Sequence, residues 1–449
     1  MKKLLVVALC LMVTVGAKAQ ENRIWSLEEC VNYALENNIS VKRNQLDVES
    51  AEIEAKASKS NFLPNLNGSA SQNLSFGQSI SPETNLRVPS NFTSTNAGLN
   101  SNTNVFNGFR NLTEYRQAKL GIETSKVSLQ KMQNDISLNV VNAYLNILFN
   151  KENLDVAKVQ RSISEEQVAR IKSLVDAGSS PVADLYDIQA TLANDIQNEV
   201  SMQNSLDLSL LTLAQILQIP STGFDVEKVD VGSPSIAMAA ENSSVIYEKA
   251  LQIMPEIKKA QLDVESTNYD LKLAKSGFYP SLNFNVGVSS FYNRKLGELE
   301  NPELFDPFGD QMINNVNYAV GLSMSVPIFN RNANKNNVKR ATIGQRQTEL
   351  ALAEEKQTLY QNIESAYLDA KSATKTFDAA KISLKSQMEA FKNAEQRFNV
   401  GAMTSYDFNQ SRNNLVSAQA TLIRSKYDYV FKMKLLKFYY GEPILEQNW

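Results

Sequence analysis

Few side chains of this 449-residue sequence could take part in chemistry, and the best candidates lie close to two glycines. Asp184 follows Gly178 by six residues, Asp407 follows Gly401 by the same interval, and Asp187 comes about one helical turn after Asp184. Carboxylates gathered at such a position could concentrate cations. The alternative is that each is a solvated acid in the first turn of a helix, where the helix dipole favours negative charge.

The sequence lacks the residues that most enzymatic sites require. It contains no histidine, which is the commonest general base and metal ligand. Cys10 lies in an N-terminal apolar run that we expect to be removed with a signal peptide, as argued next. Cys30 is then the only cysteine of the mature chain, so no intrachain disulfide is expected. No phosphate-binding loop is present, and no carboxylates converge elsewhere. We therefore expect no enzymatic activity, no cofactor and no metal.

The N-terminus has the pattern of a secretory signal peptide over residues 1–19. A basic pair precedes an apolar run from Leu4 to Val15, and a small-residue site ends at Ala19. We expect cleavage between Ala19 and Gln20. No later segment holds about 18 consecutive apolar residues, so the sequence predicts no membrane helix. The net charge of −3 offers no basic surface for nucleic acid.

The chain is a tandem duplication. The hexapeptide Gln-Leu-Asp-Val-Glu-Ser at 45–50 recurs at 261–266, and Phe62-Leu63-Pro64 recurs as Phe278-Tyr279-Pro280 at the same offset. Ala-Tyr-Leu at 143–145 recurs at 366–368, in register with Gly178 and Gly401. The sequence therefore predicts repeat 1 at 20–219, a connector at 220–243, repeat 2 at 244–440 and a tail at 441–449.

Each repeat predicts helices that lead to a β-hairpin. A capping box at Ser26 begins the first helix, and Pro64 and Pro280 end the helices before the hairpins. The apolar period then changes from 3.6 to 2, which predicts hairpins at about 66–106 and 282–328. Segments 79–90 and 294–311 are rich in proline, glycine, asparagine and acids, which indicates exposed loops.

The strand runs of about ten residues, with one apolar and one small polar face, are typical of transmembrane strands. A soluble hairpin packed on a core is the alternative. Aromatic residues at both ends favour the membrane interpretation, because interfacial girdles need them there. At the first hairpin they are Phe62, Phe106 and Phe109 against Phe76 and Phe92; at the second, Phe278, Tyr279 and Phe329 against Phe291 and Tyr292.

The longest predicted elements are two helices at about 109–176 and 332–399, which contain no proline. Apolar and small residues follow a heptad along each, which predicts a coiled-coil seam. In the second helix it runs through Leu352, Leu359, Ile363, Ala366, Ala370, Ala373, Phe377, Ala380, Leu384, Gln387, Phe391, Ala394 and Phe398. Gly178 and Gly401 are expected to end these helices in the left-handed conformation, before return helices at about 182–218 and 405–439.

Four strands per chain are too few to lie in lipid alone. An open sheet leaves the backbone groups of its edge strands unsatisfied, and bacterial barrels begin at about eight strands. We therefore expect the chain to oligomerise.

The duplicated order of helices, proline, hairpin, very long helix, glycine turn and return helix resembles the TolC-like outer membrane efflux proteins. The resemblance covers essentially the whole mature chain and is most specific at Phe62 to Leu66, Phe278 to Leu282, the Ala-Tyr-Leu motifs and the glycine turns. It implies a homotrimer with an all-α, long coiled-coil helical barrel that forms a tunnel through the periplasm. It also implies that twelve strands, four from each of three chains, close one transmembrane β-barrel.

The resemblance also implies site residues at the periplasmic tip. It assigns the constriction to Asp184, Asp187, Asp407 and Gln410, the last standing where the family has a second acid. It assigns docking of a periplasmic adaptor protein to the turns Asp176-Ala177-Gly178 and Val400-Gly401-Ala402.

The function expected from this reasoning is a passive exit duct in the outer membrane of a Gram-negative bacterium. It would contact outer membrane lipid and join an inner-membrane pump through the adaptor, so that small toxic compounds leave. The same channel in type I protein secretion is the near alternative. A secreted coiled-coil scaffold or adhesin is the distant one, since it explains the heptads but not the alternating strands.

Overall fold

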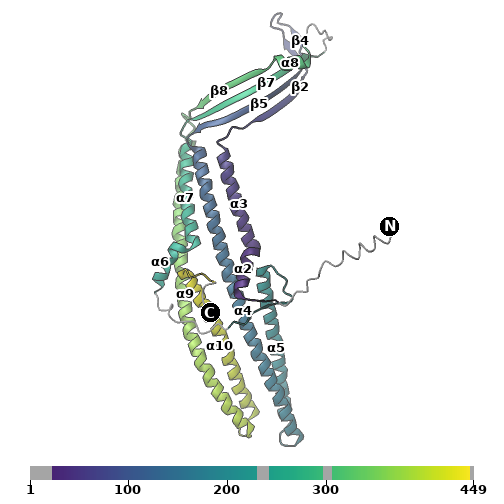
Figure 1. The fold of residues 1–449 in the computed structure, drawn as a ribbon, viewed down its shortest axis with the longest axis vertical. Helices are drawn as coiled ribbons and strands as arrows, with labels where there is room; N and C mark the ends of the chain where they lie inside the picture. Colours follow the sequence, from purple (N-terminus) through teal and green to yellow (C-terminus); the bar gives the residue numbers. More distant parts are fainter. Residues whose placement is uncertain (1–22, 230–241, 297–305, 445–449) are drawn as a thin grey trace, which may run out of the picture. The chain divides into compact units, whose positions relative to one another are not determined.

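The computed structural model describes residues 23–229, 242–296 and 306–444 (Figure 1). The predicted cleavage site at Ala19 and Gln20 lies outside the described residues. The chain forms two compact units that do not follow the repeat boundaries, which stay predictions. Among the described residues, the coil unit is 23–46, 127–229, 242–259 and 353–444, and the sheet unit is 47–126, 260–296 and 306–352.

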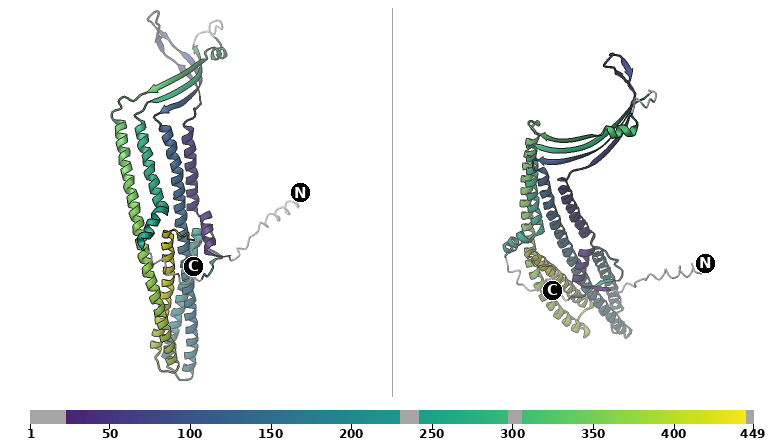
Figure 2. Two further views of the ribbon diagram at one scale, coloured as in Figure 1. Left: turned by 60° about the vertical axis from the view of Figure 1, so that its left-hand side comes forward. Right: turned by 45° about the horizontal axis from the view of Figure 1, so that its top comes forward.

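The sheet unit contains one antiparallel four-stranded sheet in the order β2-β5-β7-β8. Its strands are β2 (Asn67–Ser75), β5 (Phe92–Asn107), β7 (Ser281–Lys295) and β8 (Asn317–Ser325). The prediction of two hairpins is confirmed, and β5 pairs with β7 to join them. Strands β2 and β8 are the two edges of this sheet. All four strands join a helix at the same end of the sheet (Figure 2): helices at Ile39–Ser60 and Pro255–Ser276 precede β2 and β7, and helices at Arg110–Asp176 and Ala333–Asn399 follow β5 and β8.

The connections between paired strands are more regular than the predicted loops. Between β2 and β5, β3 (Gln78–Ile80) and β4 (Arg87–Pro89) form an antiparallel ribbon. The backbone amide of Ser81 donates to the carbonyl of Leu86, which closes the ribbon. Within the described part of the second connection, α8 (Phe308–Asn314) precedes β8.

The register corrects the predicted aromatic girdle. Phe291 pairs with Asn96 and therefore lies on the polar face of the sheet, while Tyr292 lies on the opposite face. Phe92 pairs with Lys295 and also belongs to the polar face. Of the aromatics predicted for the two interfacial girdles, Phe92 and Phe291 therefore do not lie on the apolar face that would meet lipid, because consecutive side chains of a strand point to opposite faces.

The helices begin and end close to the predicted residues. They are α2 (Leu27–Asn37), α3 (Ile39–Ser60), α4 (Arg110–Asp176), α5 (Val182–Leu217), α6 (Ser243–Ile253), α7 (Pro255–Ser276), α9 (Ala333–Asn399) and α10 (Ser405–Tyr440). The capping box at Ser26 is confirmed, because its hydroxyl accepts from the amide of Glu29, whose carboxylate accepts from the amide of Ser26. Within the described ranges, no helix combines the length and apolar character needed to cross a bilayer.

The predicted seam is buried in the coil unit. In α9 the buried residues at seam positions are Leu359, Ile363, Ala366, Ala370, Ala373, Phe377, Ala380 and Ala394. In α4 they include Ile136, Val140, Ala143, Ile147, Leu154, Ala157, Ser164 and Ile171. The heptad prediction is thus confirmed for both helices.

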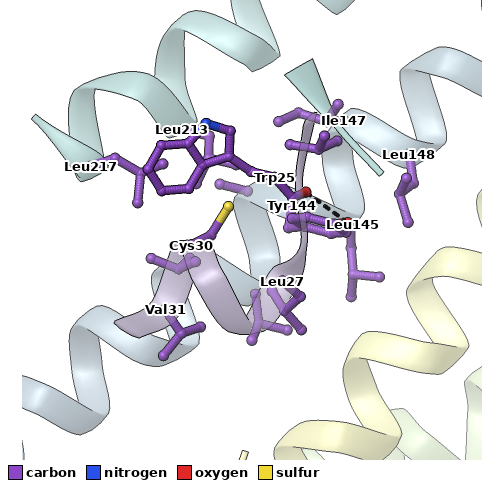
Figure 3. Close-up of a cluster of buried hydrophobic side chains, with 14 of the residues drawn as sticks. Trp25, Leu27, Cys30, Val31, Tyr144, Leu145, Ile147, Leu148, Leu213 and Leu217 are labelled. Carbon is purple, nitrogen blue, oxygen red and sulfur yellow. Dashed lines mark hydrogen bonds between the residues drawn. The ribbon is translucent and has the colours of Figure 1, made fainter. Parts of the chain in front are cut away.

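The largest core cluster of the coil unit surrounds Tyr144, the tyrosine of the first Ala-Tyr-Leu motif (Figure 3). Its hydroxyl donates to the carbonyl of Glu227 at 2.8 Å. The carbonyl lies beside a ribbon that the sequence did not predict, in which β1 (Arg23–Trp25) pairs in parallel with β6 (Phe224–Val226). Burial raises the pKa of the Cys30 thiol in this cluster to about 12, so Cys30 stays protonated at neutral pH.

In the sheet unit, one amide fixes the start of each long helix in the same way. The side-chain amide of Asn111 donates to the carbonyl of Asn61 at 3.0 Å, and that of Asn334 donates to the carbonyl of Gly277. The two residues before each helix have positive φ, at 66° and 64° for Gly108 and Phe109 and at 54° and 62° for Arg331 and Asn332. The joint between strand and helix is therefore the same in both repeats.

Replacing Gly108 by alanine is expected to destabilise the fold by about 1–3 kcal/mol, because φ is positive there. A Cβ would also lie 2.7 Å from the carbonyl oxygen of Ser276. The control is Gly121→Ala in α4, which meets nothing within 4 Å and is expected to gain about 1 kcal/mol in helix propensity. Thermal unfolding in detergent, followed by circular dichroism, measures both. Equal midpoints for the two variants would contradict the close packing at Gly108.

Candidate functional site

The two glycine turns of the coil unit share one backbone motif. The amide of Gly178 donates to the carbonyl of Val175, and the amide of Ser179 donates to that of Leu174. After α9, the amides of Gly401 and Ala402 make the equivalent bonds to Phe398 and Arg397. Gly178 and Gly401 have φ of 71° and 74°, as a Schellman motif requires of the residue after the helix end. The prediction that these glycines end the long helices is confirmed.

The predicted constriction acids lie in the first turn of each return helix. The Ser180 hydroxyl donates to a carboxylate oxygen of Asp184 at 2.7 Å. The Thr404 hydroxyl donates to the carboxylate of Asp407 at 2.8 Å and accepts from the amide of Asp407 at 3.1 Å. Both acids therefore also serve as helix-start residues, where the dipole favours a carboxylate.

The remaining constriction candidates point away from the helix packing. Asp187 and Gln410 are exposed, and the Gln410 amide donates to the side-chain oxygen of Asn414 at 3.2 Å. Among the described residues of one chain, no hydrogen bond or ion pair joins Asp184 to Asp407. Within one protomer the candidates thus form two separate acidic positions that match each other by sequence repeat.

The predicted docking turns are exposed. Asp176, Ala177 and Gly178 are exposed on the first turn, and Gly401 and Ala402 on the second. Val400, beside the second turn, is 79% exposed.

Exposed aromatic residues accompany the turns. Tyr186 in α5 and Tyr406 in α10 are 65% and 77% exposed, and the seam pattern gave no reason to single them out. Behind the second turn, Phe408 stacks on Phe398 with ring centroids 4.4 Å apart. The turn therefore rests on a packed aromatic pair while its outer surface stays free in one chain.

An arginine joins the two hairpins of the coil unit near their ends. The Arg170 guanidinium, on α4, donates to the side-chain oxygen and to the carbonyl of Asn399, the last residue of α9. The final carbonyls of a helix lack intrahelical partners, and a cation there also interacts well with the dipole. The contact therefore fixes the end of α9 against α4.

A buried polar network joins the same two hairpins through α4, α5 and α10. The Arg412 side chain on α10 is 4% exposed and donates to Asp195 of α5 at 3.1 Å. Arg412 also donates to the hydroxyl of Ser164 on α4, which in turn donates to Asp195 at 2.5 Å. Ser164 holds a polar position in the predicted seam, which was the one signal in the sequence for this network.

The fold and the turns together define a class of protein. The two long helices α4 and α9 each follow a strand of a sheet with one apolar and one polar face, and each ends in an exposed glycine turn. Such an arrangement can build a conduit that starts in water and ends in lipid.

Comparison with known proteins gives the family. The model of the outer membrane efflux protein family matches residues 30–217 and 246–442. The chain therefore belongs to this family and is an outer membrane protein of a Gram-negative bacterium.

Individual relatives are similar along most of their length. The outer membrane protein TolC of Vibrio cholerae is 24% identical over 456 residues, covering 97% of this chain and 95% of the relative. The alkaline protease secretion protein AprF of Pseudomonas aeruginosa is 18% identical over 332 residues, covering 73% and 66%. The crystal structure of the CmeC outer membrane channel of Campylobacter jejuni has a TM-score of 0.74 at 19% identity and covers 94% and 88%. These likenesses confirm the predicted fold.

Replacing Asp195 by asparagine is expected to destabilise the coil unit by about 3 kcal/mol, because it leaves the buried Arg412 charge without its carboxylate. The control is Glu114→Gln, which breaks the exposed ion pair with Arg110 and is expected to cost at most about 1 kcal/mol. Thermal unfolding of the two purified variants provides the comparison. An Asp195→Asn protein as stable as the control would show that the network contributes little.

Proposed function

We propose that this chain is the outer membrane duct of a tripartite efflux system. Three copies close one barrel of twelve strands and one helical tunnel, and the duct carries out no catalysis. It connects through a periplasmic adaptor to an inner-membrane pump. Small toxic compounds leave through it passively.

The observation that carries this proposal is the sheet of the sheet unit. Its edge strands β2 and β8 each leave one side without a partner in the described chain, and such edges must be paired in lipid. The apolar face of β8 is exposed, with Val320 at 72%, Leu322 at 64% and Met324 at 68%. An antiparallel pairing of β8 with β2 of a neighbouring copy satisfies both edges and leaves the apolar face to lipid.

The glycine turns supply the second part of the proposal. Asp184 and Asp407 occupy the same place after each turn, so a trimer brings six such carboxylates to one end of the tunnel. Closely spaced carboxylates attract multivalent cations strongly. The exposed turns beside them, with Val400 and Tyr406, form the surface on which the adaptor docks.

Protein secretion is the second candidate function. It is supported by the likeness to AprF, whose name assigns that protein to protease secretion. The same duct serves either role, since the pump selects the cargo. A neighbouring gene for a small-molecule pump favours efflux, and one for a protein-exporting ATPase favours secretion.

The acidic constriction predicts block by multivalent cations. Native trimers in a planar bilayer are expected to conduct, and a trivalent cation added on the side of the turns should close them. In the double variant Asp184→Asn and Asp407→Asn, the half-blocking concentration should rise at least about tenfold, because six carboxylates are lost. Asp207→Asn, an exposed acid further along α5, is the control. If the double variant were blocked at the same concentration as the native protein, the assignment of the constriction to Asp184 and Asp407 would be wrong.

Docking on the turns predicts site-specific cross-linking in cells. A photo-reactive amino acid at Ala177 or Ala402 should form a product with a periplasmic adaptor protein, identified by mass spectrometry. The same group at Glu83, between β3 and β4, is the control and should give no adaptor product. Equal yields at all three positions would argue against docking at the turns.

A further inference from the structure

The polar face of the four-stranded sheet has almost no charge. The register places asparagine, serine, glycine and alanine in rows across the four strands, and we call this surface the amide face. Two neighbouring rows, read from β5 to β8, are Asn102-Asn285-Gly321 and Asn100-Gly287-Ala319. Within the four described strands, the charged residues are Arg294 and Lys295, both at the end of β7 beside the loops.

Amides of this face are available to a solute. In the described chain, the side chains of Asn100 and Asn285 have no hydrogen-bond partner, and Asn100 is exposed. Each offers two N–H donors and one carbonyl acceptor. Next to them, the Asn104 amide nitrogen donates to the side-chain oxygen of Asn283 at 3.0 Å, while the side-chain oxygen of Asn104 is buried without a partner in the described chain. A Cβ at Gly321 would meet nothing within 4 Å, and one at Gly287 would lie 3.9 Å from the side-chain nitrogen of Asn100.

The apolar face of the same sheet indicates which of its two sides meets water. Val286, next to Asn285, is 39% exposed in one chain, and it belongs to the face that carries Val320 and Leu322. In the proposed trimer this apolar face meets lipid, so the amide face lines the exit path. The inference therefore rests on the proposed function.

We propose that the amide face is a transit surface that does not select solutes by the sign of their charge. It interacts by hydrogen bonds with hydroxyl, amide and ether groups, and it admits anions, cations and neutral polar solutes alike. A charged wall would concentrate one sign of ion and exclude the other. Any selection by charge in this protein is then made at Asp184 and Asp407, near the glycine turns.

Single cysteines test this inference. The native chain is a suitable background, because Cys30 is 0% exposed and burial raises the pKa of its thiol to about 12. Asn285→Cys and Asn100→Cys place a thiol on the amide face, and Val286→Cys is the matched control one residue away. Native trimers and each variant are placed in planar bilayers and treated with a cationic and an anionic methanethiosulfonate of similar size. Each rate is divided by the rate of that reagent with a free thiol in solution.

The amide-face cysteines are expected to react with both reagents, with normalised rates that agree within about threefold, while Val286→Cys stays unmodified. A difference of about tenfold or more between the two reagents is the range that a charged wall produces and would overturn the inference. The inference would also be overturned if the Val286→Cys variant were modified while the Asn285→Cys and Asn100→Cys variants, in conducting trimers, did not react. Native protein that forms no conducting trimers would instead contradict the proposed function.

Discussion

Apolar and small side chains at heptad spacing hold the two 67-residue helices against their neighbours, and most of the structure depends on that packing. A helix of this length has no stable tertiary position without such a seam, because packing rather than propensity supplies most helical stability in proteins. Alanines such as Ala366, Ala370 and Ala373 let helices approach closely. The seam thereby brings the return helices, the glycine turns and the acids that follow them to defined places in the coil unit.

The sequence predicts the features that repeat locally and misses those that depend on distant partners. Heptads and glycines are local signals, so the buried seam and the turns at Gly178 and Gly401 could be predicted. Three-residue strands such as β1 and β6 are too short to show a periodicity. They form because each pairs along its whole length with a partner about 200 residues away, and the Tyr144 hydroxyl donates to the carbonyl of Glu227 beside them. Arg412 and Asp195 are 217 residues apart, and no pattern in the sequence relates them.

Strand patterns gave the polar and apolar faces but not the placement of every aromatic ring. Phe291 and Tyr292 are adjacent in the sequence and looked equivalent as interfacial residues, yet the pairing of Phe291 with Asn96 assigns it to the amide face. Composition at the end of a strand can thus predict that aromatics gather there. Only the register shows which of them meet lipid and which meet the polar side.

The hydrogen bonds of the joint between sheet and helix lie within one half of the chain each time, although Gly108 also packs against Ser276 of the other half. Asn111, the carbonyl of Asn61 and the left-handed pair at 108–109 all come from repeat 1, and their counterparts at 334, 277 and 331–332 all come from repeat 2. A half-length ancestor with one copy would already have possessed these hydrogen bonds, and six such chains would supply the twelve strands of the proposed trimer. Gene duplication would then halve the number of subunits in the proposed ring while each half keeps the hydrogen bonds that fix the start of its long helix.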